Sequence, residues 1–231
     1  MVNYSGDYQF GNLLFCIFAL ELKNKYNMAK INKKQSNSSF NTYITIGANN
    51  HVDIEREEND FYATPPKATR LLMELETFNH NIWEVCCGMN HITNILKESG
   101  YNVRTSDIID RVNDGNIEII DFLSCNEKWQ GDIVTNPPYK FASEFVYKAM
   151  ECVENGCKVA MFLKLTFMET KARKELFKQY PPKVIYVSSS RLGCSSNGDF
   201  NEDGNATSAI AYCWYIWEKG YKGDTIIKWF N

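Results

Sequence analysis

The feature that most constrains the fold is an alternation from residue 60 onward, in which short apolar runs take turns with segments of helical periodicity. Each short apolar run predicts a strand. The predicted strands cover residues 82–86, 102–106, 117–120, 132–135, 158–163, 183–188 and 209–217. Helices are predicted near 91–99, 141–154 and 169–179, and a further helical pattern, with apolar Leu71, Leu72 and Leu75, opens at Pro65-Pro66.

This order of elements predicts an α/β fold. Strands that alternate with helices form a mostly parallel sheet with helices on both faces. The last two predicted strands are instead separated by Ser189–Ser208, a stretch rich in Gly, Ser, Asn and Asp. Because no helix connects them, these two strands are expected to run antiparallel to each other. We therefore expect a mostly parallel, seven-stranded sheet with an antiparallel last strand.

The length favours one main domain, since 231 residues exceed the roughly 100–200 of a typical domain only slightly. We expect residues 60–231 to form this domain and residues 1–59 to be an N-terminal extension and polar linker, with disorder over 30–42. The apolar stretch Leu13–Leu20 is far shorter than the roughly 20 residues that span a bilayer. It predicts a short docked helix, or it lies outside the working protein, because Met28 offers an internal start.

Cysteine and histidine usage argues against disulfides and against a metal site. None of the 8 cysteines forms a CxxC pair, and the 3 histidines are scattered. Cysteine in apolar runs is typical of small core residues in a reducing compartment, so we expect free thiols, no metal and a cytoplasmic location. The net charge of −3 provides no general basic field, and any contact with nucleic acid has to rest on a local patch.

Residues Asn136-Pro137-Pro138-Tyr139 form a rigid corner at the end of the predicted strand 132–135. Proline fixes φ and has no N–H, so the chain has to turn here before the next helix begins. The Asn136 side chain and the neighbouring carbonyls are then held as fixed acceptors, with Tyr139 beside them as a stacking face. Such a corner suits a planar group that carries an NH2. The alternative is an ordinary strand-to-helix turn, which Asn-Pro also favours.

A second set of candidate residues follows the first three predicted strands. Gly88 lies in a tight turn after the first strand, where backbone N–H groups can approach a ligand. Asp107 ends the next strand about 20 positions later, where nucleotide-binding α/β folds hold a ribose. Asp121 ends the third strand and is placed to meet an adenine amine. A tight turn and two helix caps or turn residues would explain each position separately, but their order at successive strand ends favours a nucleotide-like site.

On these residues the chain resembles the Rossmann-like class I S-adenosylmethionine-dependent amino-methyltransferases, and it is most similar to small phage and bacterial adenine-N6 DNA methyltransferases. The matching segments lie in the order that these enzymes use. They are Phe61–Pro66 as the N-terminal cofactor motif, Glu84–Ile92 as the glycine motif, Asp107 as the ribose acid, Asp121-Phe122 as the adenine contact and Asn136–Tyr139 as the catalytic motif. The resemblance implies S-adenosylmethionine as the cofactor, bound by Tyr62, Thr64, Pro65, Glu84, Cys86, Gly88, Asn90, Asp107, Asp121, Phe122 and Asn136.

One residue departs from the family pattern, because Asn90 stands where the glycine motif has its second glycine. Asparagine tolerates a left-handed backbone better than other non-glycine residues. We therefore expect the loop to form, with the Asn90 side chain crowding the methionine end of the cofactor.

The resemblance also implies a reaction, with Asn136, Pro137, Pro138 and Tyr139 as the catalytic set. The Asn136 side chain and the Pro137 carbonyl would accept hydrogen bonds from the amine and make its nitrogen more nucleophilic, without a metal or a shifted general base. A base in a duplex has to be flipped out to reach such a corner, and Tyr139 would stack on it. Phe141 or Phe167 could add a second face, although packing explains both.

The expected partner is DNA, or RNA, and a monomer without membrane or metal is favoured. Arg191, in the loop before the last predicted strand, is a candidate contact to a phosphate or a guanine edge, unless that loop is merely a flexible surface segment. The motif does not separate adenine N6 from cytosine N4, an RNA amine or a protein glutamine. A protein that binds cofactor or nucleic acid without turnover is a further alternative, because Asn90 departs from the pattern and no separate recognition domain follows Tyr139.

Overall fold

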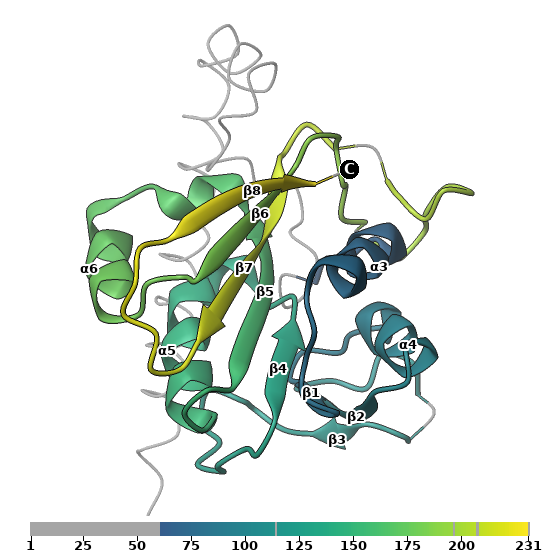
Figure 1. Cartoon of the computed structure of the whole chain (residues 1–231). Coiled ribbons are helices and arrows are strands. Elements are labelled where there is room, and N and C mark those ends of the chain that lie inside the picture. The colour runs from purple at the N-terminus through teal and green to yellow at the C-terminus, as the bar shows by residue number, and fades with distance from the viewer. Residues whose placement is uncertain (1–60, 114, 196, 207, 231) are drawn as a thin grey trace, which may run out of the picture. The chain divides into compact units, whose positions relative to one another are not determined.

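One eight-stranded sheet forms the centre of the fold in the residues that this computed structural model describes, which are 61–113, 115–195, 197–206 and 208–230. The strand order is β3-β2-β1-β4-β5-β7-β6-β8, which Figure 1 shows from one side. The strands are β1 (Asn81–Glu84), β2 (Asn102–Asp107), β3 (Glu118–Ile119), β4 (Asp132–Thr135), β5 (Lys158–Lys164), β6 (Val184–Ser188), β7 (Tyr212–Glu218) and β8 (Ile226–Phe230).

The strand directions confirm the expected mostly parallel sheet. Strand β1 pairs in parallel with β2 and β4, and these pair in parallel with β3 and β5 respectively. Strand β7 lies between β5 and β6 and is antiparallel to both. The predicted antiparallel pairing of the strands on either side of Ser189–Ser208 is therefore confirmed.

The expected count of seven strands is wrong, because β8 adds an eighth that pairs in parallel with β6. The last strand of the described chain is thus parallel to its neighbour, and the antiparallel strand β7 is the last but one. The apolar side chains of β8 are exposed, with Ile226 at 50%, Ile227 at 44% and Trp229 at 71%. This short run lacks the buried, alternating pattern that identifies a strand in a sequence.

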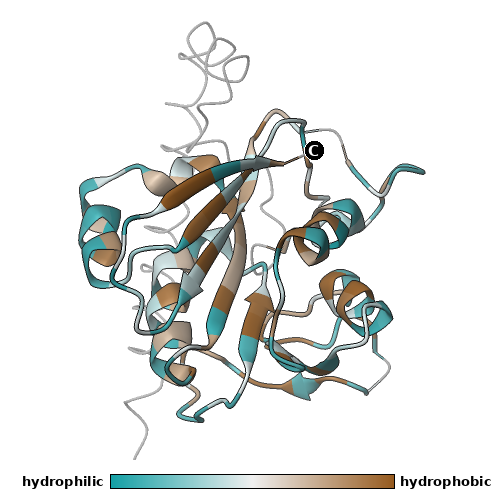
Figure 2. Cartoon of the chain, in the orientation of Figure 1, coloured by the Kyte–Doolittle hydropathy of each residue, from teal (hydrophilic) through white to brown (hydrophobic). Residues whose placement is uncertain are grey.

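Helices cover both faces of the sheet, as predicted. Figure 1 shows α3 (Pro66–Leu75) and α4 (His91–Glu98) on one face, with α5 (Ala142–Cys152) and α6 (Lys171–Gln179) on the other. Helix α3 begins with proline in its first turn, where the missing N–H has no helical partner to lose. Figure 2 shows that α6 is mostly hydrophilic, and Leu176 is its one buried residue among those described.

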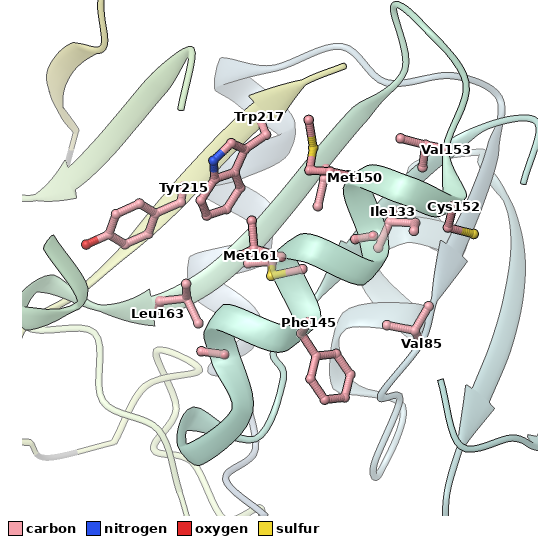
Figure 3. Close-up of a cluster of buried hydrophobic side chains, with 14 of the residues drawn as sticks. Val85, Ile133, Phe145, Met150, Cys152, Val153, Met161, Leu163, Tyr215 and Trp217 are labelled. Atoms are coloured by element: carbon pink, nitrogen blue, oxygen red, sulfur yellow. The ribbon is translucent and has the colours of Figure 1, made fainter. Parts of the chain in front are cut away.

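Two hydrophobic cores form because neighbouring residues of a strand point to opposite faces. Trp83, Met161 and Tyr215 belong to the core under α5, part of which Figure 3 shows. Their neighbours Ile82 and Phe162 belong to the second core, under α3 and α4. The nearly complete burial of both sets explains why the central strands could be predicted as continuous apolar runs.

The predictions for residues 1–59, namely the helix over Leu13–Leu20, the linker over 30–42 and the internal start at Met28, lie outside the described residues. No helix in the described part of the chain has the length and apolarity needed to cross a bilayer. The described residues also contain no group of three His, Cys, Asp or Glu side chains that could hold a metal ion. The described cysteines are free thiols: Cys86, Cys87, Cys125, Cys152, Cys157, Cys194 and Cys213.

Candidate active site

A cavity of about 550 Å³ opens at the edge of the sheet where the parallel strands β1, β2, β3 and β4 end. This is the edge at which open α/β sheets bind ligands. The cavity brings together most of the residues that the sequence predicts, namely Tyr62, Thr64, Cys86, Gly88, Asp107, Asp121, Phe122, Asn136, Pro137, Pro138 and Tyr139. Four predicted residues are not part of its lining: Pro65, Glu84, Asn90 and Arg191.

The glycine loop forms one wall of the cavity. Gly88 has a left-handed backbone with φ of 54°, and Asn90 follows in the same region with φ of 64°, as expected for this asparagine. The Cys87 N–H donates to the Ser106 carbonyl at 3.0 Å and holds the loop against β2. The side-chain Oδ1 of Asn90 is buried and has no hydrogen-bond partner among the described residues, so the loop carries a buried acceptor at the first turn of α4.

Asp107 connects this loop to the end of β2. Its carboxylate accepts the Gly88 N–H at 2.9 Å through Oδ2, and through Oδ1 it accepts the Ile109 N–H at 3.1 Å. The Arg111 guanidinium forms an ion pair with the same Oδ1 at 3.2 Å. A carboxylate has about four acceptor positions, so the donors among the described residues leave one position of Asp107, on Oδ2, for a further donor.

Glu84, at the end of β1, is 1% exposed and is not among the residues that line the cavity. Its carboxylate accepts a hydrogen bond from the Thr93 hydroxyl, which ties β1 to α4. Burial raises the pKa of Glu84 well above its ordinary value, although the Thr93 contacts partly oppose this shift. The geometry gives Glu84 a supporting position between β1 and α4.

Asp121 and Phe122 lie side by side but differ in their surroundings. The Asp121 carboxylate is exposed and accepts hydrogen bonds within its own turn, from the Leu123 N–H at 3.1 Å and the Ser124 hydroxyl at 2.6 Å. Phe122 is buried and packs edge-on against Trp83 at 5.4 Å between ring centres. Asp121 therefore serves its turn as well as lining the cavity.

The Asn136–Tyr139 corner forms the opposite wall, directly after β4. The Asn136 Nδ2 donates to the Tyr62 carbonyl at 2.8 Å, and this contact fixes which end of the amide is which. The other end, Oδ1, is buried and has no hydrogen-bond partner among the described residues. A buried amide oxygen without a partner is rare and costly, which makes Oδ1 a ready acceptor beside the cavity.

Aromatic rings surround Tyr139. Its ring stacks on Tyr62 with centres 5.9 Å apart and lies against Tyr212 at 5.7 Å. Its hydroxyl is 3.2 Å from the Cys194 sulfur, and the Lys164 ammonium is 5.0 Å from its ring centre. Burial raises the pKa of Tyr139 well above its ordinary value and that of the Cys194 thiol to about 12, so both groups stay protonated at neutral pH.

The other residues that were considered as substrate contacts, Phe141, Phe167 and Arg191, differ in their positions. Phe141 is 41% exposed and lines the cavity. Phe167 is buried and packs edge-on against Tyr215 at 5.4 Å, so it belongs to the core. Arg191 is exposed and is not among the residues that line the cavity, so its contact with a phosphate or a guanine edge stays a prediction.

Several residues of the site were not predicted. Arg111 follows Asp107 at the helical i,i+4 spacing, and this spacing could have identified it. Tyr212 and Cys194 carry no such local signal, because they reach Tyr139 only after the segment behind β6 folds back. That segment is fixed by two backbone hydrogen bonds between Ser195 and Ala63, at 2.8 and 3.1 Å.

Comparison with known proteins supports the fold. No protein-family model and no curated protein sequence matches this chain. Solved structures do match. One is a protein from Listeria monocytogenes inferred to be a class I S-adenosylmethionine-dependent methyltransferase, with a TM-score of 0.52, 12% identity, and coverage of 85% of this chain and 74% of that one.

Two further structures match at a TM-score of 0.50. The modification subunit of an inferred type I restriction enzyme from Vibrio vulnificus is 13% identical, over 73% of this chain and 47% of that one. An inferred O-methyltransferase from Agrobacterium tumefaciens is 9% identical, over 72% and 85%. The described chain thus has the Rossmann-like fold of class I methyltransferases, with one strand more than the seven expected.

Proposed function

We propose that this protein transfers a methyl group from S-adenosylmethionine to the exocyclic amine of a nucleic-acid base, and that the base is adenine in DNA, methylated at N6. The observation that carries this proposal is the state of Asn136. Its Nδ2 is held by the Tyr62 carbonyl at 2.8 Å, while its buried Oδ1 has no hydrogen-bond partner in the described chain. An acceptor fixed in this way fits an incoming N–H donor.

The cavity fits the proposed cofactor. Its volume of about 550 Å³ lies within the roughly 300–1,000 Å³ of small-molecule sites. The remaining acceptor position of Asp107 would accept one ribose hydroxyl, and the glycine loop and Phe122 would hold the methionine and adenine ends. When bound, S-adenosylmethionine supplies an electrophilic methyl group on a sulfonium, which leaves as a neutral thioether.

The residues of the chain would act by position and by electrostatics. The Asn136 Oδ1 and the Pro137 carbonyl accept the two N–H bonds of the amine and direct its lone pair toward the methyl carbon. That lone pair forms the new N–C bond, and the nitrogen then releases a proton to water. Neither Tyr139 nor Cys194 serves as the base. Burial raises the pKa of both groups, so each keeps its proton at neutral pH and cannot accept another.

The test is expression of the full chain in bacterial cells that lack DNA methylation, followed by nucleoside mass spectrometry of the digested DNA. We expect N6-methyladenine that disappears in Asn136→Ala. Asn102→Ala is the matched control, because Asn102 is an exposed residue of β2 whose side chain pairs with Asn81. This variant should keep the modification.

The other outcomes are equally informative. Methylation of cytosine N4 in the DNA would show that cytosine, and not adenine, is the substrate. Methylated RNA or protein beside unmodified DNA would assign the substrate to that polymer. Either result would keep methyl transfer as the reaction. Purified protein that does not bind S-adenosylhomocysteine at millimolar concentration in calorimetry would contradict a methyltransferase. Such a result would favour the alternative of a binding protein without turnover.

A further inference from the structure

Residues 61–64 form an extended segment along the rim of the cavity, held in place by the antiparallel bridge between Ala63 and Ser195. Neighbouring side chains of an extended chain point to opposite sides. The Phe61 ring lies against Gly88, since a Cβ on that glycine would come within 2.5 Å of its Cε2 atom. The Tyr62 ring instead lies against Tyr139. The two neighbours therefore serve different walls of the cavity.

The Tyr62 ring covers a face of Tyr139 that a substrate needs. The planes of the two rings differ by 24°, and their centres are 5.9 Å apart. Tyr212, on another side of Tyr139, is 5% exposed and is stacked in turn on Phe162 at 5.4 Å. Tyr212 belongs to a buried strand and cannot move aside, whereas Tyr62 is only partly buried and lies on the rim. Of these two described aromatic neighbours of Tyr139, Tyr62 is therefore the one that can yield its place to a planar ligand.

The backbone of Tyr62 also contacts the Asn136–Tyr139 corner, through Asn136. Its carbonyl accepts the Asn136 Nδ2 and thereby leaves the Asn136 Oδ1 as the acceptor beside these two rings. A base that stacked on Tyr139 would bring its amine to this oxygen. The ring and the carbonyl of one residue thus border both the stacking face and the hydrogen-bonding edge of the ligand.

Resting on the function proposed above, we propose that Tyr62 is a substrate-binding, specificity-determining residue, and that the nucleobase enters between the rings of Tyr62 and Tyr139. The ring centres have to separate to about 7 Å, twice the roughly 3.5 Å contact distance of stacked carbon atoms. This requires a small outward shift of the Tyr62 ring, while the Tyr62 carbonyl stays bound to Asn136. The resemblance assigns Tyr62 to the cofactor, whereas the geometry gives that role to Phe61 and gives the Tyr62 ring to the base.

The test uses the full chain with two ligands. The first is a mixed-sequence single-stranded oligonucleotide with one 2-aminopurine, whose fluorescence is quenched by stacking. The second is S-adenosylhomocysteine, titrated by calorimetry. Tyr62→Ala should brighten the bound probe and weaken its binding about 10-fold to 100-fold, the effect of one lost base stack, while leaving affinity for S-adenosylhomocysteine unchanged. Phe61→Ala should weaken the binding of S-adenosylhomocysteine and leave the affinity and quenching of the probe unchanged.

Two further variants separate stacking from folding. Tyr62→Phe should restore both the quenching and the affinity, and Tyr62→Leu, which keeps apolar volume without a ring, should behave like the alanine variant. This Phe and Leu pair decides the question if Tyr62→Ala does not fold. Tyr221→Ala, in the turn between β7 and β8, is the control and should leave both ligands bound as in the wild type.

The inference and the proposed function can fail separately. Wild-type affinity and quenching in Tyr62→Ala would overturn the role of Tyr62, as would a loss of S-adenosylhomocysteine binding equal to that in Phe61→Ala. A wild-type protein that does not bind the probe would overturn the base slot. A protein that binds and quenches the probe through Tyr62 but methylates no nucleic acid would keep the slot and refute methyl transfer.

Discussion

The ring of Phe61 lies so close to Gly88 that a Cβ atom on this glycine would come within 2.5 Å of Phe61 Cε2. The glycine is therefore required twice, for its left-handed φ of 54° and for the space that it leaves to the ring. The Arg111 guanidinium lies 4.7 Å from the centre of the same ring. A rim residue, a loop and an ion-paired side chain thus meet at one end of the cavity.

Gly88→Ala should therefore affect ligand binding more than folding. The left-handed backbone costs about 1 kcal/mol of unfolding free energy, and the displaced Phe61 ring should weaken S-adenosylhomocysteine binding by about tenfold or more. Gly100→Ala is the matched control, because Gly100 has φ of 89° but nothing within 4 Å of a Cβ. Calorimetry and denaturant unfolding of both variants check this, and equal loss of affinity in the two would contradict it.

Glu84→Gln should stabilise the cofactor-free protein at high pH. The folded-state pKa of Glu84 is raised by burial, so above the ordinary value of about 4.3 the folded state binds more protons than the unfolded state. The free energy of unfolding then falls as pH rises, by roughly 1.4 kcal/mol for each unit of pKa difference. Thermal unfolding should give the variant a higher melting temperature than the wild type at pH 8, and the difference in melting temperature should be smaller at pH 5. A gap independent of pH would refute this prediction.

Acid should weaken the docking of residues 197–206 on His91, which contacts Phe200 of that segment. Burial lowers the pKa of His91, and its ring lies edge-on against Phe200 at 5.2 Å. The neutral ring therefore favours docking fully above the ordinary pKa of about 6.5, and this contribution is lost as pH falls below it. Amide hydrogen exchange over 197–206, corrected for intrinsic rates, should be faster at pH 5.5 than at pH 7.5. His91→Leu should remove the difference.

Arg104→Lys should destabilise the protein by about 1–2 kcal/mol, because lysine cannot replace a stacked, forked guanidinium. Arg104 donates to Glu118 at 2.6 and 2.8 Å and to Glu127 at 2.6 Å, and it lies 4.2 Å above the Trp83 ring. Arg70→Lys is the control, since its pair with Glu98 is exposed, at 56% and 61%. Exposed pairs contribute little, so the control should lose less than about 0.5 kcal/mol in urea unfolding. A loss as large as that of Arg104→Lys would contradict the argument.

The sequence was most informative where burial is complete. All four residues of β4 are buried, and the predicted bounds 132–135 match those of the structure. Strand β8 was missed because its side chains are largely exposed and its pairing with β6 supplies the order. Hydrophobic periodicity reports burial, so it does not detect a strand that is held mainly by backbone pairing.

The residues of the site also differ in whether the sequence could predict them. Gly88, Asp107 and Asn136 could be placed together because the ends of parallel strands meet at one edge of a sheet. Tyr212 and Cys194 could not, because their contacts with Tyr139 depend on how a long connection folds back. Arg191 is exposed, which leaves its predicted contact with a phosphate or a guanine edge as a prediction.

The bridge between Ala63 and Ser195 has a consequence for synthesis on the ribosome. Residues 61–64 are translated before their partner Ser195, and strands β1 to β6 are translated between them. Until then a nascent chain has the glycine loop and the Asn136 corner but lacks the rim that joins them. The order of translation thus places completion of the rim after synthesis of the glycine loop and of the Asn136 corner.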